Sequence, residues 1–91
     1  MQKYIDDDYA IVLGHPLRLG ILCELSTGPK TVSELNKTFP VSQTNLSQHL
    51  KKMRELGFLS TKRKAQFIHY KISDKDLLVV SRAIKAKLYN E

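Results

Sequence analysis

Residues 41–57 constrain the fold most, because they have the pattern of a capped helix with two unlike faces. At 100° per residue, the apolar side chains gather in a narrow arc and the polar side chains point roughly the opposite way. The arc holds Leu46, Leu50, Met53 and Gly57, and the polar face holds Thr44, Ser47, Gln48, Lys51 and Lys52. Hydroxyl and amide groups at a helix start suit base edges in DNA, and lysines one turn later suit phosphates. An ordinary amphipathic helix fits the stretch equally well, so its flanks must decide.

The charge of the chain favours a polyanionic partner. Fifteen Lys and Arg residues against nine Asp and Glu give a formal charge of +6 and a pI near 9.6. From Ser42 to Lys71 there are seven basic residues and one acid, Glu55. The 91 residues predict a single domain spanning 1–91, with a modest core. No window reaches the ~20 apolar residues of a membrane span, and we expect a cytoplasmic protein that does not contact a membrane.

The residues before this stretch predict three further helices. A first helix is expected over 3–13, and a second from Pro16, at its first turn, to about Ser26. Thr31 and Glu34 form a capping-box pattern that opens a third helix ending near residue 38. A three-residue corner follows, and Ser42 then caps the next helix. Two helices joined by so short a corner predict a helix-turn-helix.

After Gly57 the pattern changes from helical to alternating, which predicts a β-hairpin. Its strands are expected over 59–63 and 67–72, and Ile68, Tyr70 and Ile72 on one face should cover the core. A basic hairpin behind a helix-turn-helix indicates a wing, although such a charge run can also be only a solvated tip. The predicted fold is mainly α with a β-hairpin (α+β): a winged helix-turn-helix with about five helices and a two-stranded wing.

The last helix carries more apolar surface than a small subunit needs. It is expected to start with a capping box at Ser73 and to run to about Tyr89. We infer that the first and last helices pair across a homodimer interface; the alternative is that their stripes close the core of a monomer. The predicted interface consists of Ile5, Tyr9, Val12, Leu77, Val80, Ile84 and Leu88.

Four segments in this order, 15–22, 31–35, 42–50 and a hairpin ending at Tyr70, resemble the ArsR/SmtB family of transcriptional repressors. The resemblance implies a homodimeric winged helix-turn-helix that binds an operator and is released by an effector. It points to four base-reading residues: Gln43, Thr44, Ser47 and Gln48. Gln43 rests on the resemblance and on its place in the first turn. The expected phosphate contacts are Ser42, Lys51, Lys52 and the wing residues Lys62, Arg63 and Lys64.

The metal sites of that family do not carry over, and we expect neither a metal nor a cofactor. Its metal sensors place a cysteine pair on the helix before the recognition helix, where this chain has no Cys or His. Others use Asp and His on the last helix, where this chain has Asp74 and Asp76 but no histidine. His15, His49 and His69 lie on different elements, so a structural role is expected for each, with His49 packed at the edge of the groove.

Three short segments, 21–25, 64–66 and 87–89, resemble the haemolysin-activator and biofilm-growth regulator branch of the family. Some members of that branch sense reactive sulfur or oxidants through two cysteines. Cys23 resembles the first, but the place of the second is held by Asn90, so one subunit cannot form a two-thiol switch. Cys23 is either a small core residue or a sensor thiol that acts alone.

We therefore expect a repressor-like regulator that binds a palindromic operator in double-stranded DNA as a homodimer. A small effector or an oxidant is an open partner. The alternative is a winged-helix interaction module that docks an acidic protein. Such a face should expose aromatic or aliphatic anchors, and residues 43–48 offer only Leu46, which points inward. No Ser/His/acid set, carboxylate pair or glycine-rich phosphate loop predicts an enzyme.

Overall fold

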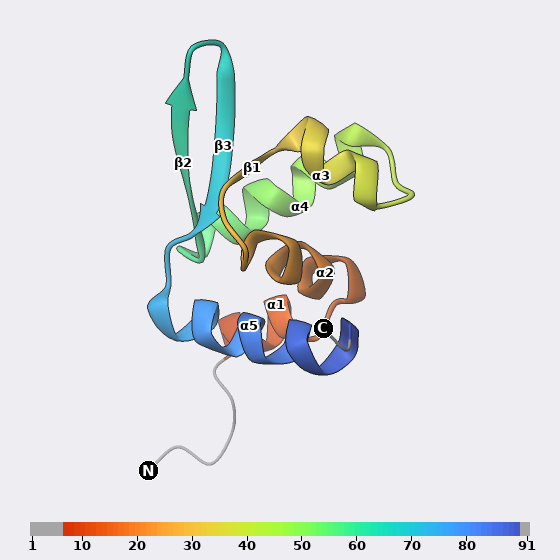
Figure 1. The fold of residues 1–91 in the computed structure, drawn as a ribbon, viewed down its shortest axis with the longest axis vertical. Coiled ribbons are helices and arrows are strands. Elements are labelled where there is room, and N and C mark those ends of the chain that lie inside the picture. The colour runs from red at the N-terminus through yellow and green to blue at the C-terminus, as the bar shows by residue number, and fades with distance from the viewer. Residues whose placement is uncertain (1–6, 90–91) are drawn as a thin grey trace.

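The computed structural model describes residues 7–89, a winged helix-turn-helix that is mostly helical (Figure 1). In the described chain, five helices and three strands follow in the order α1 (Asp7–Leu13), α2 (Pro16–Leu25), β1 (Lys30–Thr31), α3 (Val32–Thr38), α4 (Gln43–Glu55), β2 (Leu59–Lys64), β3 (Phe67–Ile72) and α5 (Lys75–Tyr89). The β2–β3 hairpin, α3 and α4 lie at one end of the molecule and α1 and α5 at the other, with α2 between them. Of the first helix expected over 3–13, residues 3–6 lie outside the described residues.

Two helices begin at the predicted caps, Thr31 and Ser42, and a third begins at a cap formed by His15. Thr31 and Glu34 make both hydrogen bonds of a capping box at the start of α3. Ser42 Oγ accepts a hydrogen bond of 3.0 Å from the backbone N–H of Asn45 at the start of α4. His15 Nδ1 accepts one of 3.2 Å from the backbone N–H of Leu17, beside Pro16 in the first turn of α2. These local signals fix where the chain enters each helix.

The cap predicted at Ser73 is wrong by one residue. Asp74 precedes α5, and its Oδ1 accepts a 2.9 Å hydrogen bond from the backbone N–H of Leu77. Asp74 Oδ2 accepts a 2.6 Å hydrogen bond from the Tyr9 hydroxyl, so the same carboxylate also ties α1 to α5. Both bonds stabilise the charged form, with Tyr9 the larger cause, and lower the pKa of Asp74. Ser73 Oγ instead donates to the carbonyl of Gly57.

The sheet has three antiparallel strands in the order β1-β3-β2, and not the two that were predicted. β1 pairs Lys30 with Tyr70 and Thr31 with His69. Two residues are too few to show an alternating pattern, so β1 is identified only by its pairing with β3. β2 and β3 pair from Leu59 opposite Ile72 to the hairpin end, where Ala65 takes the left-handed φ of 55°.

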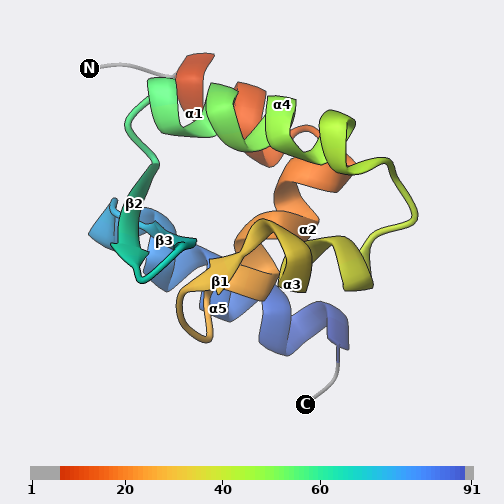
Figure 2. The same cartoon turned by 90° about the horizontal axis from the view of Figure 1, so that it is seen from above.

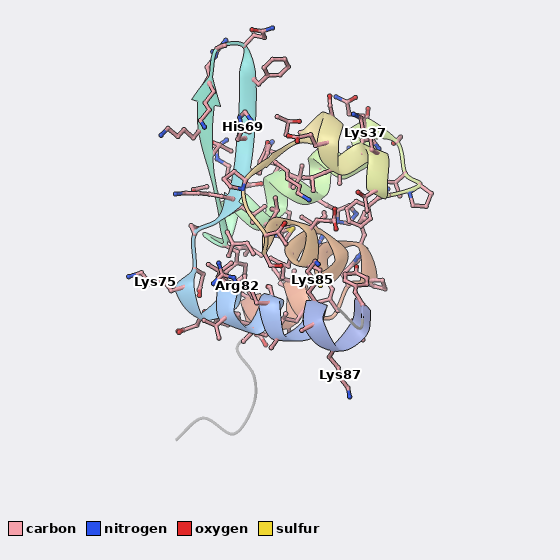
Figure 3. The ribbon with its side chains drawn as sticks, in the orientation of Figure 1. Lys37, His69, Lys75, Arg82, Lys85 and Lys87 are labelled. Atoms are coloured by element: carbon pink, nitrogen blue, oxygen red, sulfur yellow. The ribbon has the colours of Figure 1, made fainter. Side chains whose placement is uncertain are left out.

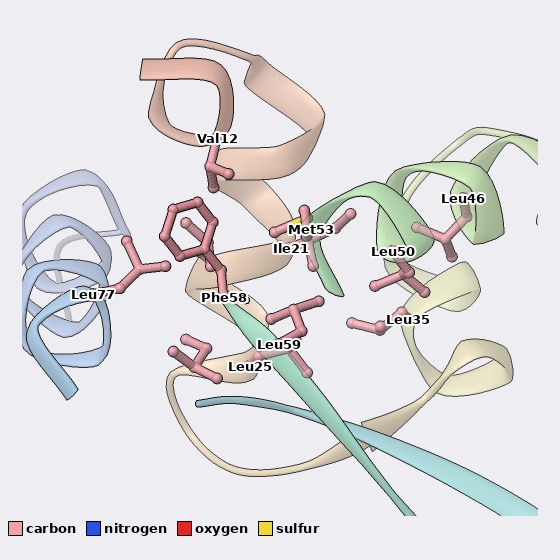
Figure 4. Close-up of a cluster of buried hydrophobic side chains, with 12 residues drawn as sticks. Val12, Ile21, Leu25, Leu35, Leu46, Leu50, Met53, Phe58, Leu59 and Leu77 are labelled. Carbon is pink, nitrogen blue, oxygen red and sulfur yellow. The ribbon is translucent and has the colours of Figure 1, made fainter. Parts of the chain in front are cut away.

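The core confirms three of the four residues of the predicted apolar arc; the fourth, Gly57, is exposed and lies beyond the end of α4. Leu46, Leu50 and Met53 are fully buried among side chains from the other helices and the base of the hairpin (Figure 4). This core also includes Val12, Ile21, Leu22, Leu25, Leu35, Phe58, Leu59, Ile72 and Leu77. Tyr70 packs against it as expected, whereas Ile68 is 48% exposed because it lies farther along the hairpin, beyond the core.

Two residues of the predicted dimer interface belong to the core of the single chain. Val12 is 0% exposed and Leu77 is 1% exposed, so neither leaves surface for a partner. Val80 and Leu88 are exposed on α5, where Val79 joins them, and Ile84 and Tyr9 are half-buried. Ile5 lies outside the described residues. The α1–α5 end therefore retains an apolar surface, smaller than the sequence pattern suggested.

Candidate nucleic-acid interface

The polar residues predicted to read bases share one surface of α4. Gln43, Thr44 and Gln48 are exposed and Ser47 is half-buried. Together with Lys51 they line one shallow hollow on the surface of α4: Gln43, Thr44, Ser47, Gln48 and Lys51. Of the expected phosphate contacts on this helix, Ser42, Lys51 and Lys52 are exposed. The cap and the core thus turn this face toward solvent, with only Ser47 partly covered.

The corner between α3 and α4 is held by specific contacts. The Asn36 side-chain amide donates a 2.9 Å hydrogen bond to the carbonyl of Val41, so α3 fixes the entry to α4. Phe39 in the corner packs its ring against Gly20 of α2, where an added Cβ would lie 2.8 Å from a ring carbon. Gly20 is needed for this approach, a requirement that the helical pattern of α2 alone could not reveal.

Behind the polar face, His49 packs into a polar cluster that joins α4 to α2. Arg18 Nε donates a 3.1 Å hydrogen bond to His49 Nδ1, and Arg18 also donates to the carbonyl of Ile11. The rings of His15 and His49 lie with centroids 4.7 Å apart. His49 is half-buried, as expected for a residue at the edge of the groove. Burial lowers the pKa of His49, and the neighbouring Arg18 and His15 lower it further.

The lowered pKa of His49 predicts a loss of stability in mild acid. Because the folded-state pKa lies below the unfolded value of 6.5, the unfolded chain takes up this proton first as the pH falls. The contribution of His49 to the free energy of unfolding is complete above that value and is lost as the pH falls through the lowered pKa. His49→Gln keeps a neutral acceptor but does not titrate, so its unfolding should depend less on pH.

Urea unfolding of both proteins at about pH 7.5 and pH 5 measures this difference. The pKa values of Asp74 and Glu34 are also lowered, but both proteins carry these groups, so their contribution is the same in each. An equally steep decline in the His49→Gln variant would show that His49 is not the group responsible.

The basic residues of the wing lie at the far end of the hairpin. Lys62, Arg63 and Lys64 are all exposed, and Arg63 Nε donates a 3.2 Å hydrogen bond to the carbonyl of Ala65 in the turn. Pairing of Lys62 with His69 and of Lys64 with Phe67 puts both lysines on one face of the hairpin and Arg63 on the other. Figure 1 shows the hairpin projecting on the same side of the molecule as α3 and α4.

Two apolar residues at the hairpin end are functional candidates that the sequence reasoning missed. Phe67 is 52% exposed and Ile68 is 48% exposed, directly after the turn. The pattern assigned Ile68 to the core, yet large apolar side chains this close to a hairpin turn are too far from any core to be covered. Apolar side chains at such a tip can pack in a DNA minor groove or contact a protein partner.

Cys23, the predicted sensor or core thiol, lies in α2 and is 1% exposed. Burial raises its pKa, and the nearby Lys85 opposes this only in part. The thiolate is the reactive form, so a raised pKa disfavours reaction in this conformation. Asn90, the position of the missing second cysteine, lies outside the described residues. Within 7–89 no group of three or more His, Cys, Asp or Glu could hold a metal ion, and no helix is long and apolar enough to cross a membrane.

Comparison with known proteins gives matches over most of the chain. Residues 15–61 match the model of the arsR family of bacterial regulatory proteins. The chain is 39% identical to the biofilm growth-associated repressor of Agrobacterium fabrum over 62 residues, 68% of this chain and 53% of that protein. It is 38% identical to the HTH-type transcriptional regulator YgaV of Escherichia coli over 74 residues, 80% of this chain and 75% of that protein.

Solved structures show the same fold. The structure of HlyU from Vibrio cholerae superposes with a TM-score of 0.82 at 29% identity, covering 93% of this chain and 91% of that chain. These matches confirm the resemblance to the haemolysin-activator and biofilm-growth branch. The match spans only about half the length of the first curated relatives, for example 53% of the Agrobacterium repressor.

Proposed function

The chain belongs to the ArsR family of bacterial regulatory proteins, and from that premise we propose that it binds double-stranded DNA as a homodimer and represses transcription. The observation that carries this proposal is the clustering of four uncharged polar side chains and one lysine in one hollow on α4. A basic hairpin projects on the same side of the molecule. The family consists of transcription regulators, and we propose no catalytic role for this chain.

In the proposed complex, α4 enters the major groove, which is about 12 Å wide and admits a helix. The amides of Gln43 and Gln48 suit adenine, which offers one donor and one acceptor in that groove, and the hydroxyls of Thr44 and Ser47 can bond either kind of group. Phosphate contacts come from the start of α4, its next turn and the wing, through Ser42, Lys51, Lys52, Lys62, Arg63 and Lys64.

The homodimer is proposed to form through the α1–α5 end, which lies at the opposite end from the hairpin. Figure 2, seen from above, shows α5 running beneath α2 and β1. The large apolar side chains left exposed on α1 and α5 are Ile11, Val79, Val80, Leu88 and Tyr89. A two-fold axis through this surface would present two α4 helices to half-sites about one helical turn apart, or a multiple of it.

Replacing Val80 by aspartate should convert the dimer to a monomer, because a buried unpaired charge opposes association. Val80 is 42% exposed in the single chain, so the fold should survive. The matched control is Ile68→Asp, since Ile68 is 48% exposed but lies on the hairpin. Sedimentation velocity at micromolar concentration measures the outcome. A dimeric Val80→Asp protein, or two variants that dissociate alike, would contradict the proposed interface.

Selection from a pool of random duplexes tests the function itself. We expect enrichment of a roughly palindromic sequence, and an affinity that falls steeply as salt rises, because phosphate contacts release counterions. No enriched sequence, together with binding that is insensitive to salt, would overturn the proposal.

Exposed Phe67 and Ile68 at the tip favour a second candidate, a winged helix that docks an acidic protein. The variant Phe67→Ser separates the two. If the tip packs against DNA, the variant should bind duplex more weakly than the native chain does, whereas for a protein-docking tip its affinity for duplex should be unchanged.

A further inference from the structure

A second basic site lies on the hairpin, away from the polar face of α4. On the face of β2 and β3 opposite Tyr70 and Ile72, a hollow of about 210 Å³ is lined by Pro29, Lys62, Lys64, His69 and Lys71. His69 lies along β3 in the middle of the hairpin (Figure 3). Pairing places Lys62 directly across from His69, so the hollow is built from side chains that the register of two strands holds together.

Two polar atoms on this face are covered from solvent and have no hydrogen-bond partner in the described structure. They are Nδ1 of His69 and Oγ of Ser60, which lies across from Lys71. Buried polar atoms in folded proteins almost always have a partner in the protein, in water or in a bound ion. His69 lines the hollow, so a polar occupant there can supply a partner for its ring; Ser60 lies on the same face of the hairpin but does not line the hollow.

The charges around the hollow indicate that the occupant is an anion. Three lysines line it and no carboxylate does. Glu34 acts on His69 from the start of α3, but its Oε1 already accepts a 2.9 Å hydrogen bond from the backbone N–H of Thr31, the main reason why the pKa of Glu34 is lowered. Neighbouring ammonium groups without a counter-charge repel one another, and an anion among them would remove that repulsion.

We propose that this hollow binds a phosphate-type anion, held by Lys62, Lys64 and Lys71 with His69 at its wall. At about 210 Å³ it is smaller than the ~300–1,000 Å³ of sites for whole drug-sized ligands, so it recognises a phosphate or pyrophosphate group. The group can come from a free phosphorylated compound or from the DNA backbone. A free anion would compete with operator DNA for Lys62 and Lys64, a consequence that rests on the proposed function.

Titration of the DNA-free protein with inorganic pyrophosphate, at ionic strength held constant with chloride, tests the site. The ring signals of His69 in NMR spectra should shift and saturate. Lys71→Gln, outside the proposed DNA contacts, should weaken binding at least about fivefold, because it removes a charge-assisted hydrogen bond. The control Lys75→Gln removes an exposed lysine on α5 that does not line the hollow, and should change nothing. A shift that never saturates, or one that Lys71→Gln leaves unchanged, overturns the site.

A second experiment adds duplex DNA to the protein. It distinguishes a free phosphorylated compound from the DNA backbone as the source of the bound phosphate group. If pyrophosphate shifts His69 and weakens duplex binding in the native chain more than in Lys71→Gln, the site takes a free anion. If only duplex shifts His69, the site takes a backbone phosphate. If neither does, the site is refuted even when the protein binds DNA. If pyrophosphate binds but no duplex does, the site stands and the proposed function fails.

Discussion

Replacing Leu50 by alanine should lower the free energy of unfolding by about 2–5 kcal/mol, the range for truncating a buried leucine. Leu50 is 0% exposed, and it lies in α4 among Leu46, Met53 and Leu35. A domain of this size has a total stability on the order of 5–15 kcal/mol, so the loss is a large share of the whole. DNA binding should fall with it, because the polar face of α4 is presented only while the buried face is packed.

Urea unfolding followed by circular dichroism measures this loss. The matched control is the next residue, since Lys51 is exposed on the opposite face and Lys51→Ala should change stability by less than about 0.5 kcal/mol. A similar loss of unfolding free energy in the two variants would contradict the assignment of one face of α4 to packing and the other to recognition.

The features that were predictable from the sequence are those encoded locally. The period of Leu46, Leu50 and Met53 and the cap at Ser42 lie within one helix, so they place α4 and its polar face without knowledge of the rest. The capping box at Thr31 is local in the same sense. At Ser73 two adjacent residues both suit a cap; Asp74 takes that place, and its other carboxylate oxygen accepts a hydrogen bond from Tyr9, 65 positions away.

The remaining features depend on contacts between distant segments. β1 exists because Lys30 and Thr31 pair with β3. The helical pattern places Val12 on the apolar side of α1. It does not show whether that side packs into the core of the same chain or against a second chain. An alternating pattern assigns Ile68 to a face but does not show that the core ends before it. The hollow beside His69 could not be predicted for the same reason. Its lining residues come together only through the pairing register of β2 and β3, and the sequence alone does not determine that register.

Replacing Gln43 and Ser47 together by alanine should abolish most of the preference for the operator. A bidentate contact to a base contributes about 1–3 kcal/mol of discrimination, and a dimer makes each contact twice. Discrimination should therefore fall by at least about 30-fold. Neither residue is charged, so affinity for unrelated DNA should change little.

Arg63→Ala provides the contrast from the wing. Because Arg63 is exposed near the hairpin turn and is proposed to contact phosphate, its loss should weaken binding to operator and to unrelated DNA alike. The slope of log affinity against log salt should become shallower by about two, one for each subunit. An Arg63→Ala protein that loses affinity only for the operator would place this residue among the base readers.

The most direct test of the account is the ratio of affinities for the selected operator and for a scrambled duplex of the same length, at one salt concentration. We expect the Gln43→Ala/Ser47→Ala protein to lose this ratio by at least about 30-fold while its affinity for the scrambled duplex is retained. If the ratio is unchanged, or if both affinities fall in parallel, α4 does not read bases through its polar face and the central claim is wrong.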